Sequence, residues 1–254
     1  MEYSSKARKA RLRLVGISVL AAAVVVGGGV LAVGTFGSSE KKADHTSPTK
    51  ETTSPSPSRS SSHQQKFTPA TGPQTPLLKP ATTKNGIGVG FEHSSLGAES
   101  AAINYWQDLD ILDDGITRRQ LTAVTSRDSM ESIDQGISQV RSTREDLGLP
   151  PSGGTPAGIT ISTVVKASLS RSLDDAGDVV VVWMVYDRYA TVADKGADDA
   201  PLKDEVTSVI VKWQDGDWKL TEEPKYVKKK RGPSAYDPNS TFAFQDGWRE
   251  VASE

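Results

Sequence analysis

The chain has 254 residues, no cysteine and a formal net charge of -2, from 30 basic and 32 acidic side chains. Without cysteine it forms no disulfides, thiol nucleophiles, zinc–thiolate sites or iron–sulfur clusters, and it carries no lipid attached to a cysteine. The near balance of charge gives no general attraction to nucleic acid, so no stable nucleic-acid partner is expected.

The first distinctive feature is an uncharged, strongly apolar segment over residues 14–36. Its length of about 23 residues is sufficient for a helix to cross a bilayer core of about 30 Å. Residues 1–13 contain five basic side chains and only Glu2 as an acid, which predicts a cytoplasmic stub. A cleaved signal peptide has a shorter apolar region of about 7–15 residues. We therefore expect a single-pass transmembrane helix in the cell membrane, with the rest of the chain extracytoplasmic.

Residues 37–85 form a segment rich in Ser, Thr, Pro and Lys. Such a composition buries too little apolar surface to offset the entropy of ordering the chain, which predicts a disordered linker. We expect it to hold a folded domain, residues 86–223, away from the membrane.

Helical periodicity marks the first part of this domain. Ser94 or Ser95 can cap a helix whose apolar stripe includes Tyr105, and the dipeptide Asp113-Asp114 with the following glycine ends it. Thr117 and Gln120 match a capping box that opens a short second helix. A third helix is expected from about Ser129, with one apolar face formed by Met130, Ile133, Ile137 and Val140.

The apolar period then changes from that of a helix to that of a strand. In residues 159–165, apolar side chains alternate with polar neighbours, which predicts a strand. Residues 177–192 contain a long apolar run typical of a central strand. Asp215-Gly216, between two further runs of this kind, predicts a hairpin turn. Three helices followed by about four antiparallel strands indicate an α+β domain with the helices packed on a curved sheet.

Residues 224–254 form a C-terminal extension that is basic and then aromatic. We expect it to dock on the domain or on a partner. Its candidate interaction residues are Lys228, Lys229, Lys230, Arg231, Tyr236, Phe242, Phe244 and Trp248.

The sequence contains no arrangement that predicts catalysis, a metal site or a cofactor site. His93 is expected to be a local hydrogen-bonding or capping residue, since no nucleophile motif accompanies it. Aligning residues 110–121 with a calcium loop leaves two ligand positions occupied by leucine, so a solvated helix end is the better interpretation. Residues 86–90, GIGVG, lack the remaining features of a dinucleotide site and suggest a flexible domain entry.

The hairpin VIVKWQDGDWKL, residues 209–220, and the opening GVGFEHSSLGAESAAINYWQDL, residues 88–109, carry a family resemblance. The first resembles the end of the nuclear-transport-factor-2-like (cystatin-like cone) fold. The second is similar to exported domains of actinobacterial membrane proteins found beside conjugation genes. With the anchor and linker, the chain resembles bitopic assembly factors of type IV secretion and conjugative transfer.

This resemblance implies a non-enzymatic interaction module with protein partners in a membrane complex, and it leaves a homo-oligomer open. One alternative is an extracytoplasmic domain that binds a small ligand or a wall polymer in an apolar pocket. Another is an isomerase-like enzyme, in which Tyr105, Tyr186 or Tyr189 acts with Asp108 or Asp187. The enzyme alternative requires a buried carboxylate of raised pKa.

Overall fold

The computed structural model describes residues 66–193, 196, 197 and 201–253. The predicted cytoplasmic stub, the transmembrane helix at residues 14–36 and most of the predicted linker lie outside these residues. Among the helices of the described part, none combines the length and apolar character that a membrane crossing requires.

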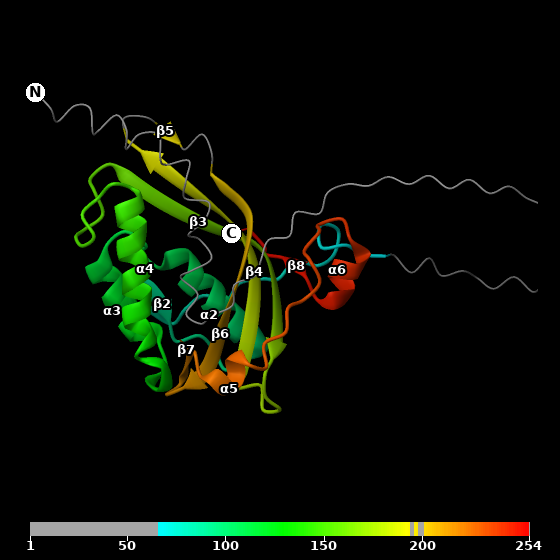
Figure 1. Ribbon diagram of the computed structural model, residues 1–254. Coiled ribbons are helices and arrows are strands. Elements are labelled where there is room, and N and C mark those ends of the chain that lie inside the picture. Colours follow the sequence, from blue (N-terminus) through cyan, green and yellow to red (C-terminus); the bar gives the residue numbers. More distant parts are fainter. Residues whose placement is uncertain (1–65, 194–195, 198–200, 254) are drawn as a thin grey trace, which may run out of the picture. The chain divides into compact units, whose positions relative to one another are not determined.

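In the described chain a short two-stranded hairpin comes first, followed by helices and then by a mainly antiparallel meander (Figure 1). In chain order the elements are β1 (Thr82–Lys84), β2 (Ile87–Val89), α2 (Ser95–Asp108), α3 (Asp114–Val124), the 3-10 helix η2 (Arg127–Ser129), α4 (Ser132–Asp146), β3 (Ile159–Ser172), β4 (Val179–Val192), β5 (Gly196–Ala197), β6 (Leu202–Gln214), β7 (Asp217–Leu220), α5 (Pro224–Val227), α6 (Thr241–Asp246) and β8 (Arg249–Glu250).

The larger sheet has the strand order β7-β6-β4-β3-β8, and β5 pairs with β4. The pairings β3–β4, β4–β6, β6–β7 and β3–β8 are all antiparallel. The sheet is curved, with α2, α3 and α4 on one side and α5 and α6 on the other (Figure 1). The predicted α+β class, with helices packed on a curved antiparallel sheet, is confirmed.

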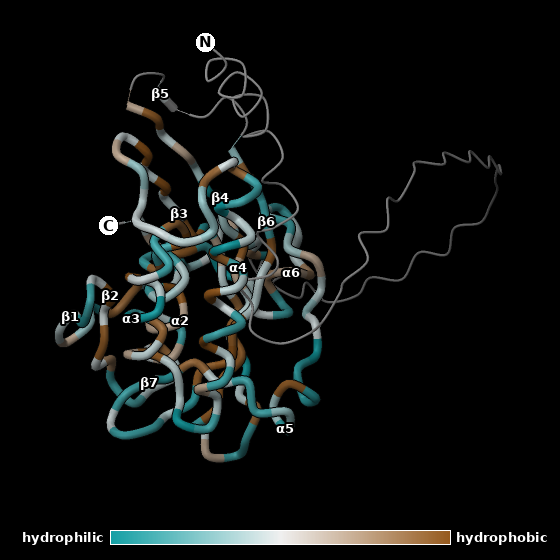
Figure 2. The backbone as a smooth tube through the Cα atoms, turned by 60° about the vertical axis from the view of Figure 1, so that its left-hand side comes forward, coloured by the Kyte–Doolittle hydropathy of each residue, from teal (hydrophilic) through white to brown (hydrophobic). Residues whose placement is uncertain are grey.

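The central strand β4 is buried on both faces, which explains its unbroken apolar sequence. Its even-numbered residues, such as Val182 and Met184, belong to a core shared with α2 and β2. Its odd-numbered residues, such as Val181 and Trp183, belong to a second core shared with Ala243 and with the C-terminal segment. Figure 2 shows the hydrophobic stretches concentrated along the central strands. Apolar cores therefore lie on both sides of the sheet.

The turn between β6 and β7 has the predicted chemistry. Asp215 and Gly216 both adopt positive φ angles, 57° and 78°, as a two-residue type I′ turn requires. The register Gln214↔Asp217 and Trp213↔Trp218 places this dipeptide at the tip of the hairpin.

The first helix begins as expected, and the second does not. Ser94 caps α2 by accepting a hydrogen bond from Gly97 N at 3.0 Å. The cap of α3 is Asp113, whose Oδ1 accepts from Ile116 N at 2.8 Å, so α3 begins at Asp114 rather than at the predicted capping box. Thr117 and Gln120 are instead buried side chains that hydrogen-bond the loop before α3, because a carboxylate was available earlier as a cap.

The third helix also begins later than predicted. The 3-10 helix η2 and Met130 precede α4, which starts at Ser132. Ile133, Ile137 and Val140 are buried as expected, whereas Met130 is 42% exposed.

The folded domain begins before residue 86, contrary to the predicted linker boundary. Thr75 exchanges backbone hydrogen bonds with the C-terminal segment, donating to Glu250 O at 2.7 Å and accepting from Ala252 N at 2.9 Å. Leu78 N donates to Ser100 Oγ of α2 at 2.9 Å. Prolines do not prevent this docking, since an extended segment can pair through its non-proline residues.

The GIGVG segment also differs from the expected flexible entry. Asn85 and Gly86 form the turn of the β1–β2 hairpin, and the following strand β2 is buried. Ile87 and Val89, at 0% and 3% exposure, pack into the first core.

Candidate interaction surface

The C-terminal extension docks on the domain and covers the second face of the sheet. Its strand β8 pairs with Ala167 and Ser168 of β3. Trp248 is 1% exposed in the second core, and its Nε1 donates to Ser234 O at 2.9 Å. The Tyr236 ring lies edge-on to Trp248 at 5.4 Å between centroids. Trp248 is therefore a core residue rather than a contact for a partner, and Tyr236 is half-buried beside it.

A second set of contacts fixes the turn around α6. Asp246 accepts hydrogen bonds from Ser234 N and Ser234 Oγ at 2.6 and 2.7 Å and forms an ion pair with Arg171 of β3. The Ser234 hydrogen bonds lower the pKa of Asp246. These contacts hold α6 in place and leave its outer residues free for other interactions.

Two of the four residues in the predicted basic run form hydrogen bonds with the domain, and the other two are exposed. Lys228 and Arg231 are exposed. Lys229 Nζ donates to Leu173 O at 3.0 Å, and Lys230 Nζ donates to Ser208 Oγ at 3.1 Å. Two of the predicted contact residues are thus partly committed to the domain itself.

The predicted aromatic residues of α6 remain at the surface. Phe242 is 77% exposed, the largest exposure of any large hydrophobic side chain in the described residues. Phe244 packs against Phe67 with ring centroids 5.7 Å apart, and the Arg249 guanidinium lies 3.6 Å from the Phe244 ring centroid. We call Phe67, Phe242 and Phe244 the α6 aromatic surface.

Sequence reasoning missed Phe67, because the Ser/Thr/Pro-rich composition assigned residues 37–85 to the linker. The available signal is an aromatic residue where the serine-rich run ends, in QQKFTPATG. Phe67 is 37% exposed. It lies at the start of the described chain and on the same surface as the C-terminal helix.

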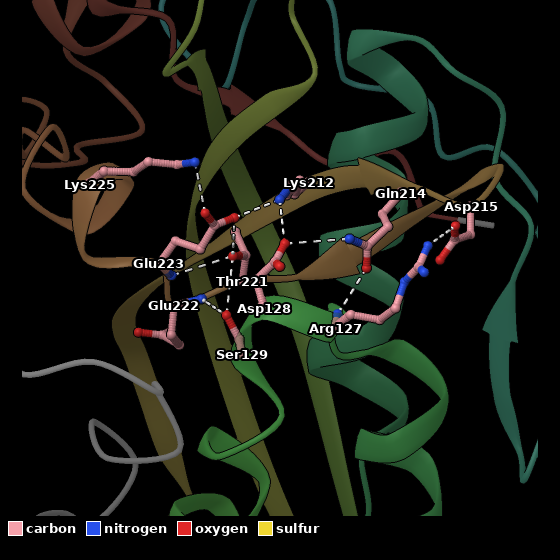
Figure 3. A network of polar contacts seen from close by, with 10 residues as sticks. All are labelled: Arg127, Asp128, Ser129, Lys212, Gln214, Asp215, Thr221, Glu222, Glu223 and Lys225. Atoms are coloured by element: carbon pink, nitrogen blue, oxygen red, sulfur yellow. Dashed lines mark hydrogen bonds and ion pairs between the residues drawn. The ribbon is translucent and has the colours of Figure 1, made fainter.

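A polar network joins the helical side of the domain to the start of the extension (Figure 3). Lys212 Nζ on β6 lies 2.6 Å from Asp128 of η2 and 2.7 Å from Glu223, and Glu223 also pairs with Lys225 at 2.8 Å. Burial alone raises the pKa of Glu223, but the hydrogen bonds from Lys212 and Lys225 leave it below its ordinary value. The network therefore holds an ionised carboxylate where the extension leaves the sheet.

Further hydrogen bonds connect η2 to the β6–β7 hairpin and to the chain that follows β7. Arg127 N donates to Gln214 Oε1 at 2.9 Å, and Arg127 forms an ion pair with Asp215 at the hairpin tip. Glu222 N donates to Ser129 Oγ at 2.8 Å (Figure 3). The 3-10 helix thus contacts both the β6–β7 hairpin and the chain that follows it.

Glu222 is the titratable group with the most unusual environment in this region. Burial raises the pKa of its carboxyl to about 8, against the opposing effect of the Lys230 ammonium. Glu222 Oε2 is buried and has no hydrogen-bond partner within the described part of the chain. Burial also lowers the pKa of Lys230.

This environment predicts a pH-dependent stability. Between the ordinary pKa of 4.5 and the folded value of about 8, the folded chain keeps a proton that the unfolded chain releases. The contribution of Glu222 to stability is therefore complete below pH 4.5 and is lost as the pH rises through 8. We expect Glu222→Gln to be more stable than the wild type at pH 8, with little difference at pH 4.5.

Urea unfolding of the wild type and Glu222→Gln at both pH values measures this effect. Glu145→Gln, at an exposed position of α4, is the matched control. An equal stability change at the two pH values for Glu222→Gln would contradict the prediction.

His93 makes long-range contacts rather than capping a helix. Its Nε2 lies 2.7 Å from Asp178 Oδ1, and its ring stacks on Trp213 with centroids 4.2 Å apart. The local role predicted for His93 is therefore wrong: His93 does form a hydrogen bond, but its partner Asp178 lies 85 positions away, on the β3–β4 connection.

Side chains considered for an isomerase form contacts within the domain. Burial raises the pKa of Asp108, as that alternative requires, and Asp108 accepts from Asn104 Nδ2 at 2.9 Å. Asp187 pairs with Lys166 at 2.8 Å and accepts from Tyr189 OH at 2.9 Å. Burial raises the pKa of Asp187, but the hydrogen bonds from Lys166, Asp204 N and Tyr189 together outweigh this effect and leave the pKa below its ordinary value, whereas the enzyme alternative requires a raised one. Tyr105 OH donates to Trp218 O at 2.7 Å.

The acidic residues just before α3 and at its first position accept hydrogen bonds from the surrounding turns. Asp110 Oδ1 accepts from Leu112 N and Asp113 N at 2.8 and 2.7 Å. Asp114 accepts from Ser152 Oγ at 2.7 Å and from Gly153 N at 3.0 Å. These bonds give the cluster a structural role in the loops around α3.

In comparisons with known proteins, no family model, curated protein or solved structure matched this chain.

Proposed function

We propose that the protein is a membrane-anchored, non-enzymatic interaction module. Residues 14–36 would cross the cell membrane, with the N-terminus in the cytoplasm, and the described domain would meet its protein partners outside. On the resemblance stated above, the assembly would be a conjugative-transfer or type IV secretion channel. No nucleic-acid partner and no cofactor form part of this proposal.

A finer assignment of the fold accompanies the proposal. Three helices followed by a curved antiparallel sheet that ends in the hairpin of residues 209–220 support a cone of the nuclear-transport-factor-2-like kind. Because that fold supports many functions, the function has to be argued from surfaces.

The observation that carries the proposal is the exposure of Phe242. A phenylalanine that is 77% exposed gains little from burial in the isolated domain. Aromatic residues are enriched at the centres of protein interfaces, where they supply much of the binding energy. Contacts of Phe244 with Phe67 and Arg249, and of Asp246 with Arg171, hold α6 in a fixed position, so the surface is pre-organised for a partner.

Cross-linking of the full-length protein in native membranes, followed by purification and mass spectrometry, tests the proposal. We expect channel proteins or a transfer ATPase to be recovered with the wild type. Phe242→Ser should weaken recovery by at least about tenfold, because an interface hot spot contributes about 2 kcal/mol or more. The thermal unfolding midpoint should not change.

Met130→Ser is the control, because Met130 is 42% exposed on the helical side of the domain. It should leave recovery unchanged. Equal recovery with Phe242→Ser and the wild type would reject the α6 aromatic surface as the contact.

One observation favours the ligand-binding alternative. Ser168 and Thr207 flank Met184 across β3, β4 and β6 on the α2 side of the sheet. Their hydroxyls, and the indole nitrogen of Trp106, are buried and form no hydrogen bond within the described residues. Unsatisfied polar groups in a core are unfavourable unless something else pairs with them. Recovery of the protein alone in the cross-linking experiment would shift the proposal to a ligand held there.

A further inference from the structure

The outer edge of β3 is a second surface that lacks a partner within the described chain. β3 runs from Ile159 to Ser172 and pairs with β4 along its whole length. On its other side β8 lies beside it (Figure 1), and within the described chain the C-terminal segment pairs with Ala167 and Ser168 and donates from Val251 N to Lys166 O at 2.8 Å. Residues 159–165, with the sequence ITISTVV, therefore form a sheet edge.

The hydrogen bonds show which backbone groups face outward from this edge. Ala193 N donates to Gly158 O, so even-numbered residues of this part of β3 face β4. Val165 N donates outward to Gln107 Oε1 of α2, and Ile159 N donates to Pro156 O. By the same alternation, the N–H and C=O groups of Ile161 and Thr163 face outward. Within the described chain these backbone groups have no hydrogen-bond partner.

The side chains do not protect this edge. Residues 159–165 contain no charged residue, no proline and no glycine, and every residue of the run except Ser162 is Ile, Val or Thr. Val164 is 46% exposed, and Thr160 and Ser162 are exposed too. Soluble proteins usually place charges, prolines or bulges on such edges, because an unprotected edge pairs with other strands.

The opposite edge of the same sheet carries these protections. β7 pairs only with residues 211–214 of β6, and Thr221 N donates to Ile210 O, so residues 202–209 also lie at an edge. That edge carries the charged run Lys203, Asp204 and Glu205, and Asp204 has a left-handed φ of 58° that interrupts the strand. The C-terminal extension also reaches this edge through a Lys230–Ser208 hydrogen bond. The absence of such features on residues 159–165 is therefore a specific property of β3.

We infer that a second copy of this chain pairs with β3 through residues 159–165, in an antiparallel arrangement about a two-fold axis at Ser162. In this register Ile161 of one copy lies opposite Thr163 of the other. Since the outward N–H and C=O groups of Ile161 and Thr163 are the ones that need partners, each copy satisfies those of the other. A two-fold axis makes the interface the same on both copies.

The side chains fit this register as well. Thr160 lies opposite Val164 of the second copy, Ile159 lies opposite Val165, and Ser162 lies opposite Ser162. Like charges directly opposite one another would destabilise the pairing, and this register places none opposite. Lys166, whose Nζ pairs with Asp187, falls opposite Gly158 at the end of the interface. The edge thus complements itself over residues 160–164, while the outward N–H groups of Ile159 and Val165 keep their partners within the domain.

Disulfide trapping in the full-length protein in native membranes tests this arrangement. The chain has no cysteine, so Ser162→Cys introduces the only thiol. In an antiparallel pair, residues that face each other without backbone hydrogen bonds have Cα atoms about 4.5 Å apart, within the range of about 4.4–6.8 Å found for disulfides. Mild oxidation should therefore convert most of the Ser162→Cys variant to a covalent dimer of twice the chain mass.

Two further variants make the test specific. Thr191→Cys is the control, since Thr191 is also exposed but lies on the inner strand β4, opposite Thr160. It should give several-fold less dimer. Ile161→Pro combined with Ser162→Cys removes an outward N–H that makes no bond within the described residues, and it should reduce trapping to the level of the Thr191→Cys control.

The possible outcomes separate this proposal from the α6 aromatic surface. Efficient trapping that Ile161→Pro abolishes and Phe242→Ser leaves intact supports pairing of two copies through β3. Equal trapping in the Ser162→Cys and Thr191→Cys variants would overturn it. A disulfide adduct between the Ser162→Cys variant and a protein of different mass, in place of the dimer, would also overturn it.

Discussion

Val181→Asp is expected to unfold the described domain, because it buries a carboxylate in an apolar core where the neighbouring cation, Arg171 opposite it on β3, is already paired with Asp246. Val181 is 1% exposed on β4, in the core between the sheet and the C-terminal extension. Burying an unpaired charge costs several kcal/mol, and domains of this size are stable by only about 5–15 kcal/mol. We expect a loss of at least about 4 kcal/mol in the free energy of unfolding.

Val206→Asp is the matched control for this substitution. Val206 lies opposite Val185 on the neighbouring strand but is 52% exposed. An aspartate there stays hydrated, so the change should remain within about 0.5 kcal/mol. Circular dichroism during thermal and urea unfolding measures both variants. Similar melting of the two would contradict the two-sided burial of β4.

Trp248→Ala is expected to destabilise the domain by about 3–5 kcal/mol, as truncation of a large buried aromatic leaves a cavity. The indole is 1% exposed, packs edge-on to Tyr236 and donates to Ser234 O. The loss should release the C-terminal extension from the sheet. Limited proteolysis should then cut within residues 228–247, at positions protected in the wild type.

Phe242→Ala, six residues earlier and 77% exposed, controls for the removal of an aromatic ring. It should change the free energy of unfolding by less than about 0.5 kcal/mol and leave the proteolysis pattern as in the wild type. If Trp248→Ala behaved in the same way, the extension would not be fastened to the second core, and Trp248 would be available to a partner as the sequence suggested.

The residues that the sequence placed correctly are those whose structure depends on near neighbours. Asp215-Gly216 specifies a type I′ turn through backbone preferences alone, and the spacing of Ile133, Ile137 and Val140 specifies one face of a helix. The apolar run of β4 identified a central strand. None of these inferences requires knowledge of what lies across the sheet.

The candidate interaction residues show where such reasoning stops. Phe242 and Trp248 are both aromatic residues of the C-terminal extension, yet one is 77% and the other 1% exposed. Phe67 belongs to the same surface as Phe244, although composition assigned it to a linker. The raised pKa of Glu222 depends on burial among distant segments.

The sequence by itself determined the class of the domain, the order of its helices and strands and the chemistry of its main hairpin, because periodicity, caps and turn residues act over a few positions. Only the tertiary structure decided that residues 66–85 and the C-terminal extension belong to the fold. It also showed which side chains remain exposed and that residues 159–165 form an open edge. Those properties depend on contacts such as Thr75 N to Glu250 O, between segments far apart in the chain, which local patterns do not encode.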